Sequence, residues 1–258
     1  MDELQKAKLF ASKRAQAERN VKSHIKDILS SLAKDITDAS AGISLVSSEA
    51  MFRDMLAART KGVVEDATEK IDAYVKAYSK ASITILGDKD TGATGRLLNS
   101  LLFGKTYKER NDFYMKCFLD DVVKIIIAGK RLKMRQKDIE KAVDAQYEDP
   151  YTNGIIDRAN SKGANITIPS YGRGIFHSAY SNIVRNAQGT ISIAWGRENR
   201  NFASRSGAIG FRTFRNSTYP CPICDDSAAV ELHPMDDPVP PLHLNCVCGC
   251  VFIYDKGE

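Results

Sequence analysis

A long proline-free start is the feature that most constrains what this chain can fold into. None of the first eighty residues is proline, and apolar side chains recur there every three or four positions. This spacing predicts one amphipathic helix over residues 2–32 and a second over residues 48–78. Two helices of such length make an extended hairpin or an arm of a bundle, which is unlike a compact enzyme core. We therefore expect residues 1–86 to form a long helical hairpin or arm.

The following part of the chain also predicts helices, separated by clear breaks. Residues 87–95 read GDKDTGATG, and this density of glycine and aspartate indicates a linker or turn. Helical spacing resumes over residues 107–130 and again over residues 136–147. Residues 96–158 are therefore expected to be a helical region, and residues 159–170 a loop that marks the next boundary.

The last third of the sequence mixes helix and strand patterns. A helix is predicted over residues 174–206, and Gly207 would end it. Residues 209–214 and 250–254 alternate as strands do. The expected fold class is therefore α+β and predominantly α-helical, with long N-terminal helices followed by a small helix-plus-β module over residues 170–258.

Length and composition fit a soluble protein with a real core. The chain has 258 residues, of which 43% are hydrophobic, and a net charge of +5, so disorder throughout is excluded. No apolar run approaches the roughly 20 residues that span a bilayer. The first twenty residues lack the uninterrupted apolar stretch of a secretory signal. We expect a product of the cytoplasm.

Charge is divided unevenly over the last third. Residues 171–219 contain seven arginines, no lysine and one acidic residue, for a net charge of +6, whereas residues 220–258 carry a net −6. A surface rich in arginine alone suits phosphate or carboxylate. Three partners remain open: nucleic acid, an acidic protein, and the acidic segment of the chain itself. The candidate contact residues are Arg185, Arg197, Arg200, Arg205, Arg212 and Arg215.

Five of the six cysteines fall within thirty positions, and their spacing indicates a metal site. Cys221 and Cys224 are separated by two residues, and His243 and Cys246 repeat that spacing after a further eighteen residues. Two close pairs of this kind can surround one tetrahedral zinc ion. The predicted ligands of a structural Zn²⁺ are Cys221, Cys224, His243 and Cys246.

Two details of the ligand set stay open. Cys246, Cys248 and Cys250 alternate and would project from one face of a strand, so that Cys248 or Cys250 could replace Cys246. His233 lies in the middle of the intervening loop and is expected to be solvated instead of bound to metal.

The residues argue against catalysis. Four protein ligands leave no position for a water molecule on the metal, which predicts a structural ion. The PCxxC motif at residues 220–224 reproduces half of the zinc-deaminase signature, but Ala179 follows His177 at the position where the signature requires glutamate. Asp120 and Asp121 fall beside an apolar stripe and are expected to be its solvated edge. We therefore expect a non-enzymatic protein.

The same region resembles a known protein family. It contains SAYSN at residues 178–182, CPIC at residues 221–224 and PPLHLNCVC at residues 240–248. This order resembles the phage Mu F-like minor head, or head morphogenesis, family, whose members typically end in a CPIC-type knuckle followed by PPxHPxCxC. The knuckle and the second block are the specific part of the resemblance.

The sequence departs from the family pattern in two places. Leu244 stands where the family commonly has proline, although Asn245 occupies a usual asparagine position. Residues 188–190 read Gln-Gly-Thr where members often have Arg-Thr-Glu. The match covers residues 170–254, about a third of the chain, and residues 1–170 resemble such proteins only in being helical.

The resemblance implies a component of a tailed-phage head that lies near the portal vertex and assists capsid assembly and genome packaging or delivery. Such proteins are not generally regarded as enzymes. The implied partners are the portal protein, the major capsid protein and packaged double-stranded DNA, and the implied location is the virion, after assembly in the host cytoplasm. The alternative is a zinc-containing regulatory protein that binds nucleic acid.

Overall fold

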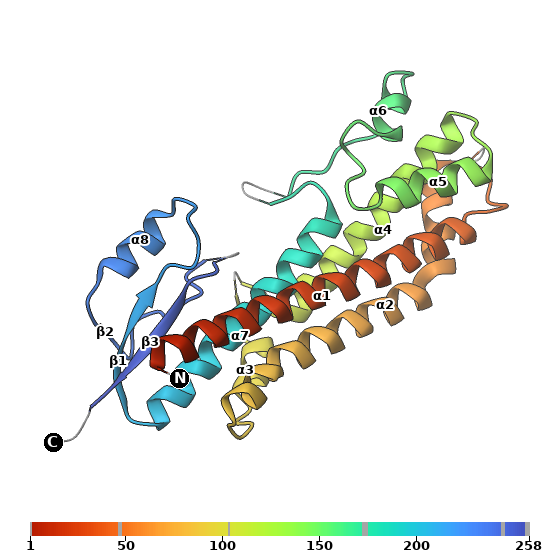
Figure 1. Cartoon of the computed structure of the whole chain (residues 1–258). Helices are drawn as coiled ribbons and strands as arrows, with labels where there is room; N and C mark the ends of the chain where they lie inside the picture. Colours follow the sequence, from red (N-terminus) through yellow and green to blue (C-terminus); the bar gives the residue numbers. More distant parts are fainter. Residues whose placement is uncertain (1, 46–47, 103, 172–174, 244–245, 256–258) are drawn as a thin grey trace. The chain divides into compact units, whose positions relative to one another are not determined.

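The computed structural model describes residues 2–45, 48–102, 104–171, 175–243 and 246–255. Within these residues the chain forms eight helices and a small antiparallel sheet of three strands (Figure 1). The predicted fold class, α+β and predominantly α-helical, is confirmed. The helices are α1 (Glu3–Ala39), α2 (Glu49–Leu86), α3 (Ala93–Asn99), α4 (Tyr107–Arg131), α5 (Gln136–Gln146), α6 (Ile155–Asn160), α7 (Ala179–Arg205) and α8 (Pro222–Ala229), and the strands are β1 (Ala208–Phe214), β2 (His233–Pro234) and β3 (Gly249–Tyr254).

Two compact units divide the chain. The sheet-containing unit consists of Met1–Lys22, Tyr74–Tyr107 and Ala187–Glu258, and the helical unit consists of Ser23–Ala73 and Lys108–Asn186. Helices α1, α2 and α7 each contribute one part to each unit. Neither unit is a continuous stretch of chain, so segments far apart in the sequence meet in each core.

Apolar side chains at helical spacing build the core of the helical unit. On α1, Ile25, Leu29, Leu32 and Ile36 are buried, and each follows the previous one by three or four residues, so they share one face. The buried residues that α2 and α4 add to this unit include Phe52, Leu56, Ile71, Phe118, Val122 and Ile125. Full burial of such a side chain contributes about 1.5–3 kcal/mol to the free energy of folding. This burial stabilises the helices, whose polar faces contribute little.

The sheet is small and has β1 in its centre, in the order β2-β1-β3. Phe211 on β1 is paired with Phe252 on β3, and the two ring centroids are 6.0 Å apart. Both rings pack with Ala203 and Cys250 in a compact apolar cluster. Because β2 has only two residues, most of the pairing in the sheet comes from β1 and β3.

The observed elements extend several predicted ones. Helices α1 and α2 continue beyond their predicted ends, to Ala39 and Leu86. The strands predicted at residues 209–214 and 250–254 are confirmed as β1 and β3. Gly174, where the sequence placed the start of the long C-terminal helix, lies outside the described residues, and α7 begins at Ala179.

Three short helices, α3, α6 and α8, are additions to the predicted elements. The predicted turn is present over its first residues, since Gly87 and Gly92 have positive φ angles of 65° and 73° that glycine adopts without strain. The prediction of a turn over residues 93–95 is wrong, because helix α3 begins at Ala93.

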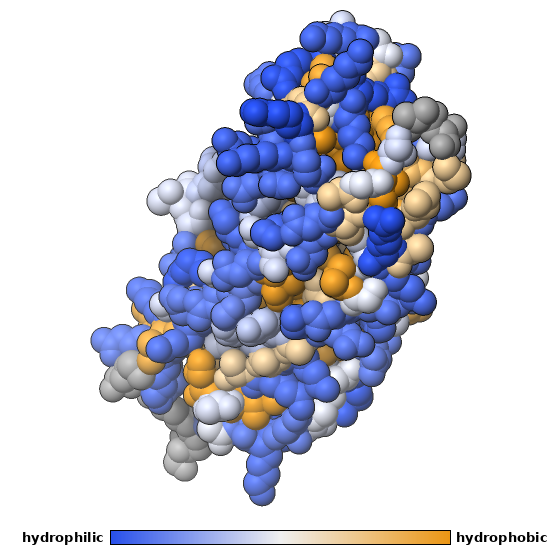
Figure 2. Space-filling model, turned by 90° about the vertical axis from the view of Figure 1, so that its right-hand side faces the viewer, coloured by the Kyte–Doolittle hydropathy of each residue, from blue (hydrophilic) through white to orange (hydrophobic). Residues whose placement is uncertain are grey.

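None of the described helices combines the length and the apolar character that a membrane span requires. The face of the molecule in Figure 2 agrees with this: hydrophilic residues predominate on it, and hydrophobic residues form small separate patches.

Candidate metal centre

The first pair of thiols is placed by the start of helix α8. Cys221 is the residue that precedes the helix, and Pro222 follows at its first position, where a missing N–H and a fixed φ are tolerated. Cys224 lies in the first turn and is buried. Side chains three residues apart lie on one side of a helix, so Cys221 and Cys224 present their sulfur atoms to the same space.

The second pair comes from the loop before β3. The backbone N–H of Cys246 donates to the carbonyl of His243 over 3.1 Å. Nε2 of His243 lies 3.2 Å from Sγ of Cys221 and 3.1 Å from Sγ of Cys224. The sulfur atoms of Cys224 and Cys246 are 3.8 Å apart. The structure therefore brings Cys221, Cys224 and His243 into one group of donor atoms, and Cys246 reaches this group through Cys224.

Each of the three distances is close to the separation of two ligands on one tetrahedral ion. Two thiolates at about 2.3 Å from a tetrahedral zinc ion are ~3.8 Å apart, and a thiolate and an imidazole nitrogen on the same ion are ~3.5 Å apart. The separation of the Cys224 and Cys246 sulfurs matches the first value, and the two sulfur–nitrogen distances fall slightly below the second. The side chains form a cluster that can hold a metal ion.

A fifth donor, Cys248, also reaches the cluster. The donor atoms of Cys221, Cys224 and His243 lie within 4.8 Å of one another, and so do those of Cys224, Cys246 and Cys248. Cys224 belongs to both groups. The five side chains thus form two donor groups that share Cys224, and Cys246 and Cys248 both belong to the second group.

Cys250 and His233 lie elsewhere. Cys250 packs in the apolar core of the sheet against Phe211. The expectation that His233 is solvated is wrong, because its ring is buried and stacks on Phe211 with centroids 4.7 Å apart. Its Nδ1 lies 2.9 Å from Oδ2 of Asp237, and its Nε2 lies 2.8 Å from the carbonyl oxygen of Ser227. Both ring nitrogens are engaged, so His233 ties β2 to its surroundings.

Burial disfavours the charged form of two thiols in the cluster. It raises the pKa of Cys224 and that of Cys248 above the ordinary value of a cysteine thiol. Thiolates are the form that binds metal, and a divalent cation offsets the cost of burying their charge. Metal binding here therefore releases protons and weakens as the pH falls.

Arg14 of α1 holds the backbone of the ligand-bearing loop. Its side chain is 4% exposed, and Nη2 donates to the carbonyl oxygens of Cys246 at 3.1 Å and Cys248 at 3.0 Å. Such contacts behind the ligands fix their orientation. Sequence reasoning missed Arg14. The signal that could have found it is an arginine on the buried stripe of an otherwise amphipathic helix.

Two of the candidate arginines pair with the chain's own acidic segment. Arg212 lies 3.4 Å from Glu231, and Arg215 forms an ion pair with Asp225. Of the three partners left open by the sequence, the acidic segment is the one that these two side chains contact.

The remaining candidate arginines are distributed over both units. Arg185 belongs to the helical unit, where its guanidinium carbon lies 5.5 Å from the ring centroid of Phe176. Arg205 pairs with Asp88 in the sheet-containing unit. The other two candidates, Arg197 and Arg200, line a cleft in the sheet-containing unit.

The expectation of a solvated edge is wrong for Asp121, which is fully buried. Its Oδ1 accepts a hydrogen bond from the hydroxyl of Tyr151 at 2.5 Å, and its Oδ2 accepts one from the backbone N–H of Ala179 at 2.8 Å. Burial raises the pKa of Asp121 to about 6. Since Ala179 is the first residue of α7, this carboxyl group caps the helix from another part of the chain.

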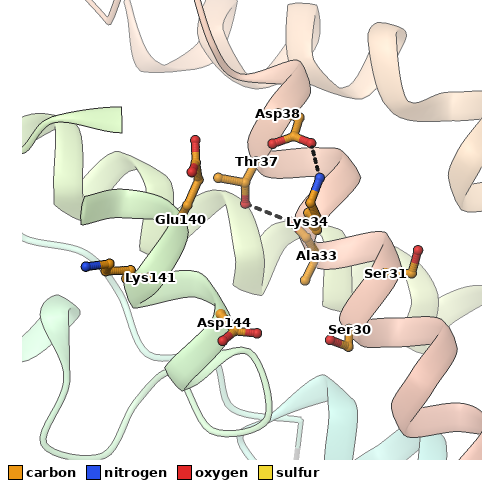
Figure 3. Close-up of a pocket in the computed structure, with 9 residues that line it drawn as sticks. All are labelled: Ser30, Ser31, Ala33, Lys34, Thr37, Asp38, Glu140, Lys141 and Asp144. Carbon is orange, nitrogen blue, oxygen red and sulfur yellow. Dashed lines mark hydrogen bonds and ion pairs between the residues drawn. The ribbon is translucent and has the colours of Figure 1, made fainter. Parts of the chain in front are cut away.

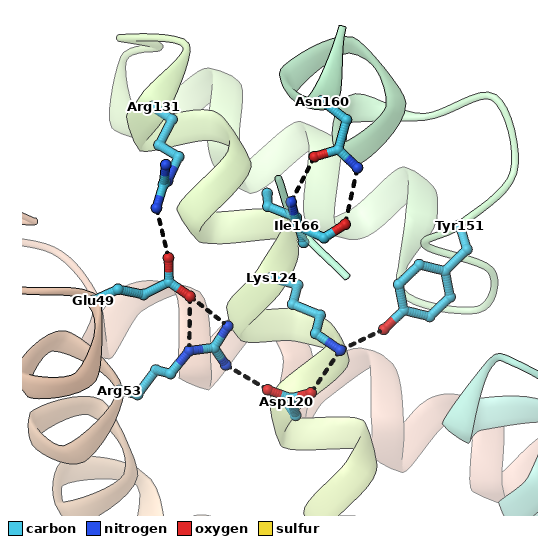
Figure 4. A network of polar contacts seen from close by, with 8 residues as sticks. All are labelled: Glu49, Arg53, Asp120, Lys124, Arg131, Tyr151, Asn160 and Ile166. Carbon is cyan, nitrogen blue, oxygen red and sulfur yellow. Dashed lines mark hydrogen bonds and ion pairs between the residues drawn. The ribbon is translucent and has the colours of Figure 1, made fainter. Parts of the chain in front are cut away.

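Asp120, by contrast, joins a network of charges on α2 and α4 in which all but the buried Lys124 are partly exposed (Figure 4). It pairs with Arg53 and lies 2.8 Å from Lys124. Arg53 also pairs with Glu49 at 2.9 Å, and Glu49 with Arg131 at 2.8 Å. Exposed ion pairs contribute at most about 1 kcal/mol each to the free energy of folding. Every charged side chain in this network has a partner of opposite charge, so we interpret the network as structural.

A pocket between α1 and α5 in the helical unit is a weaker candidate for ligand binding (Figure 3). Two lysines and three acidic residues line it: Lys34, Lys141, Asp38, Glu140 and Asp144. Lys34 is already paired with Asp38 at 2.7 Å. Charges of both signs are mixed along the walls, so they do not converge on one kind of ligand.

Comparison of the chain with protein-family models, with curated proteins and with solved structures finds no match. Function is therefore argued from the cysteine and histidine cluster and from the resemblance of the sequence around it.

Proposed function

We propose that this chain is a non-enzymatic minor head protein of a tailed phage, associated with the portal, that assists capsid assembly and genome packaging or delivery. One observation carries the proposal. The CPIC knuckle and the PPLHLNCVC block are the specific part of the sequence resemblance, and their cysteine and histidine side chains meet in one cluster. The clustering of these donors supports the metal-binding part of the resemblance.

In this proposal the cluster holds a structural Zn²⁺ through Cys221, Cys224, His243 and Cys246. Four protein ligands leave no position for water, so the ion supports folding and does no chemistry. Among the residues that the structure describes, Leu242 is the only one besides cysteines in the small apolar cluster around the thiols. Binding energy of the metal then supplies the stability that such a core lacks.

The long helices within residues 1–170 provide the docking surfaces for the portal protein and the major capsid protein. Helix α7, which carries four of the candidate arginines, would face the packaged double-stranded DNA. Both assignments follow from the resemblance and from the charge of the segment.

Co-purification of the full chain with the portal protein tests this role. We expect the portal protein to retain the chain and we expect purified virions to contain it. A chain that neither binds the portal protein nor occurs in virions would contradict the proposal.

Elemental analysis of natively purified protein tests the metal centre. We expect one zinc ion per chain, without an exchangeable water ligand in its spectrum. Protein that folds without stoichiometric zinc, or zinc that carries a bound water molecule, rules out the structural assignment.

A further inference from the structure

A cleft in the sheet-containing unit collects three arginine side chains. It has a volume of about 770 Å³, and its walls are helices α3 and α7, with residues that follow β2 at its rim. Arg96 comes from α3, and Arg197 and Arg200 come from α7. Asp236 is the one carboxylate among the described residues that line the cleft, so the lining carries a net positive charge.

The wall formed by α7 is a regular helix face. Arg197, Arg200, Asn201 and Ser204 line the cleft, and their spacing of three, one and three residues places them on one side of the helix. Two guanidinium groups, an amide and a hydroxyl thus face the same space, and all of them can donate hydrogen bonds.

The opposite wall holds its arginine in place. Nη1 of Arg96 donates to the carbonyl oxygen of Thr91 over 3.0 Å. A Cβ atom on Gly92 would lie 3.3 Å from the same nitrogen, so the guanidinium is folded closely against this turn. A side chain that is already ordered loses less entropy when it binds a ligand.

A buried carboxylate fixes the two walls to each other. Oε1 of Glu198 accepts the backbone N–H of Thr94 at 3.1 Å and its hydroxyl at 2.9 Å. Glu198 is next to Arg197 on α7, and Thr94 is in the first turn of α3. At 1% exposure Glu198 lies behind the wall, where a ligand in the cleft does not touch it.

Two of these arginines have no partner within the described part of the chain. Arg197 and Arg200 form no ion pair or hydrogen bond there, whereas Arg205, Arg212 and Arg215 are each paired with an acidic residue. The cleft arginines are exposed or half-buried and accessible.

We propose that this cleft binds consecutive phosphate groups. Guanidinium forks match phosphate oxygens in pairs, and hydroxyl and amide donors complete such a site. The cleft is large enough for a ligand of several phosphate groups. No aromatic side chain is among its described lining residues, so it offers no platform for stacking a base. Recognition is therefore of the phosphates themselves.

Phosphates in series occur in a free oligophosphate and in the backbone of a single-stranded nucleic acid. The proposal extends the DNA contact suggested for α7 to a defined cleft and to phosphate as the group it recognises. It requires neither the metal nor the portal protein, so portal binding and phosphate binding can fail independently.

Calorimetric titration of the full chain tests the proposal with three probes: inorganic tripolyphosphate, single-stranded oligothymidylate and poly-glutamate. If tripolyphosphate alone binds, the ligand of the cleft is a free oligophosphate. If the oligonucleotide binds, the ligand is a nucleic-acid backbone. Either result supports the proposal. Binding of neither, or equally tight binding of poly-glutamate, overturns it.

Variants identify the cleft as the site. We expect the double variant R197A/R200A to bind the phosphate probe at least tenfold more weakly and R197K to show an intermediate loss, because lysine keeps the charge but lacks the fork. Arg212→Ala, which removes an arginine already paired with Glu231, is the matched control and should bind as the unaltered chain does. Equal loss in the control, or none in the double variant, would disprove the assignment. The double variant leaves the cysteine cluster intact, so its behaviour also excludes an effect of tripolyphosphate on the metal.

Discussion

Helices in the helical unit bury large apolar side chains along most of their length, whereas the end of the sheet-containing unit closes around a small apolar cluster and a group of thiols. The difference follows from what each segment has to bury. Residues 23–73 and 108–186 supply isoleucine, leucine and phenylalanine at helical spacing, but residues 220–255 are rich in proline and aspartate. A segment that cannot build an adequate core requires another source of stability.

The two units also differ in how they use a buried carboxyl group. Asp121 in the helical unit has both oxygens hydrogen-bonded. Glu198 in the sheet-containing unit uses Oε1 twice, and its Oε2 has no partner among the described residues. Each group caps a helix that is remote in sequence, so in both units a single side chain fixes where a helix begins.

The largest expected effect comes from Cys224→Ala, because Cys224 belongs to both donor groups. Structural zinc contributes on the order of 10 kcal/mol to folding, so the variant should lose its metal and the ordered structure of residues 220–255, while the helical unit keeps its protection. Hydrogen exchange with elemental analysis measures both. Cys117→Ala on α4 is the matched control. If the Cys224→Ala variant keeps its metal and its protection from hydrogen exchange, the two units are stabilised in the same way and the comparison fails.

The next effect should come from the apolar core of the helical unit. Leu29→Ala removes a fully buried side chain and should lower the free energy of unfolding by about 2–5 kcal/mol, with metal content unchanged. Urea unfolding followed by circular dichroism measures it. Leu9→Ala, at a position 46% exposed on the same helix, should cost much less. Equal losses would mean that burial on α1 does not decide stability.

A pH-dependent effect should follow from Asp121. The carboxyl group ionises near pH 4 when unfolded and at about 6 when folded, so between these values the folded chain binds more protons. This group therefore makes the protein less stable as the pH rises from about 4 to about 6. Asp121→Asn keeps an acceptor for Ala179 and cannot ionise. Its free energy of unfolding, relative to the unaltered chain, should rise over this interval by on the order of 3 kcal/mol or less.

Denaturant titrations at several pH values measure this difference. The exposed Asp144→Asn in the same unit is the control for loss of a carboxylate. A difference between Asp121→Asn and the unaltered chain that does not vary with pH would contradict the burial of this carboxyl group.

The smallest expected effect concerns the contact of Arg14 with the ligand-bearing loop. Arg14→Ala leaves two carbonyl groups without their donor and should weaken metal binding roughly tenfold, as loss of contacts behind a ligand does. Competition with a chromophoric chelator measures the affinity. Arg19→Ala, an exposed arginine on the same helix, should have no effect. If the Arg14→Ala variant binds metal with unchanged affinity, Arg14 does not help to position the metal ligands of the loop.

The sequence predicted the parts of the molecule that local patterns determine. Helical spacing predicted α1, α2, α4, α5 and α7, and alternation predicted β1 and β3. The spacing of Cys221, Cys224, His243 and Cys246 predicted a cluster because such pairs have a geometric requirement that can be read along the chain.

Contacts between remote residues explain what was missed. The segment before Arg96 has poor helix formers, and α3 depends on Glu198, which is 104 positions away. Asp121 lies beside an apolar stripe in the sequence, and its burial is decided by Tyr151 and by the start of α7. The spacing of residues along the sequence does not identify any of these partners.

The contacts of Arg14 have a consequence for biosynthesis. Its acceptor on Cys246 is made 232 residues later, and a ribosome adding about 5–20 residues per second needs roughly 10–50 s to reach it. For most of that interval the start of α1 is outside the exit tunnel without its final neighbours. Chaperones therefore have time to bind this helix before the C-terminal segment packs against it.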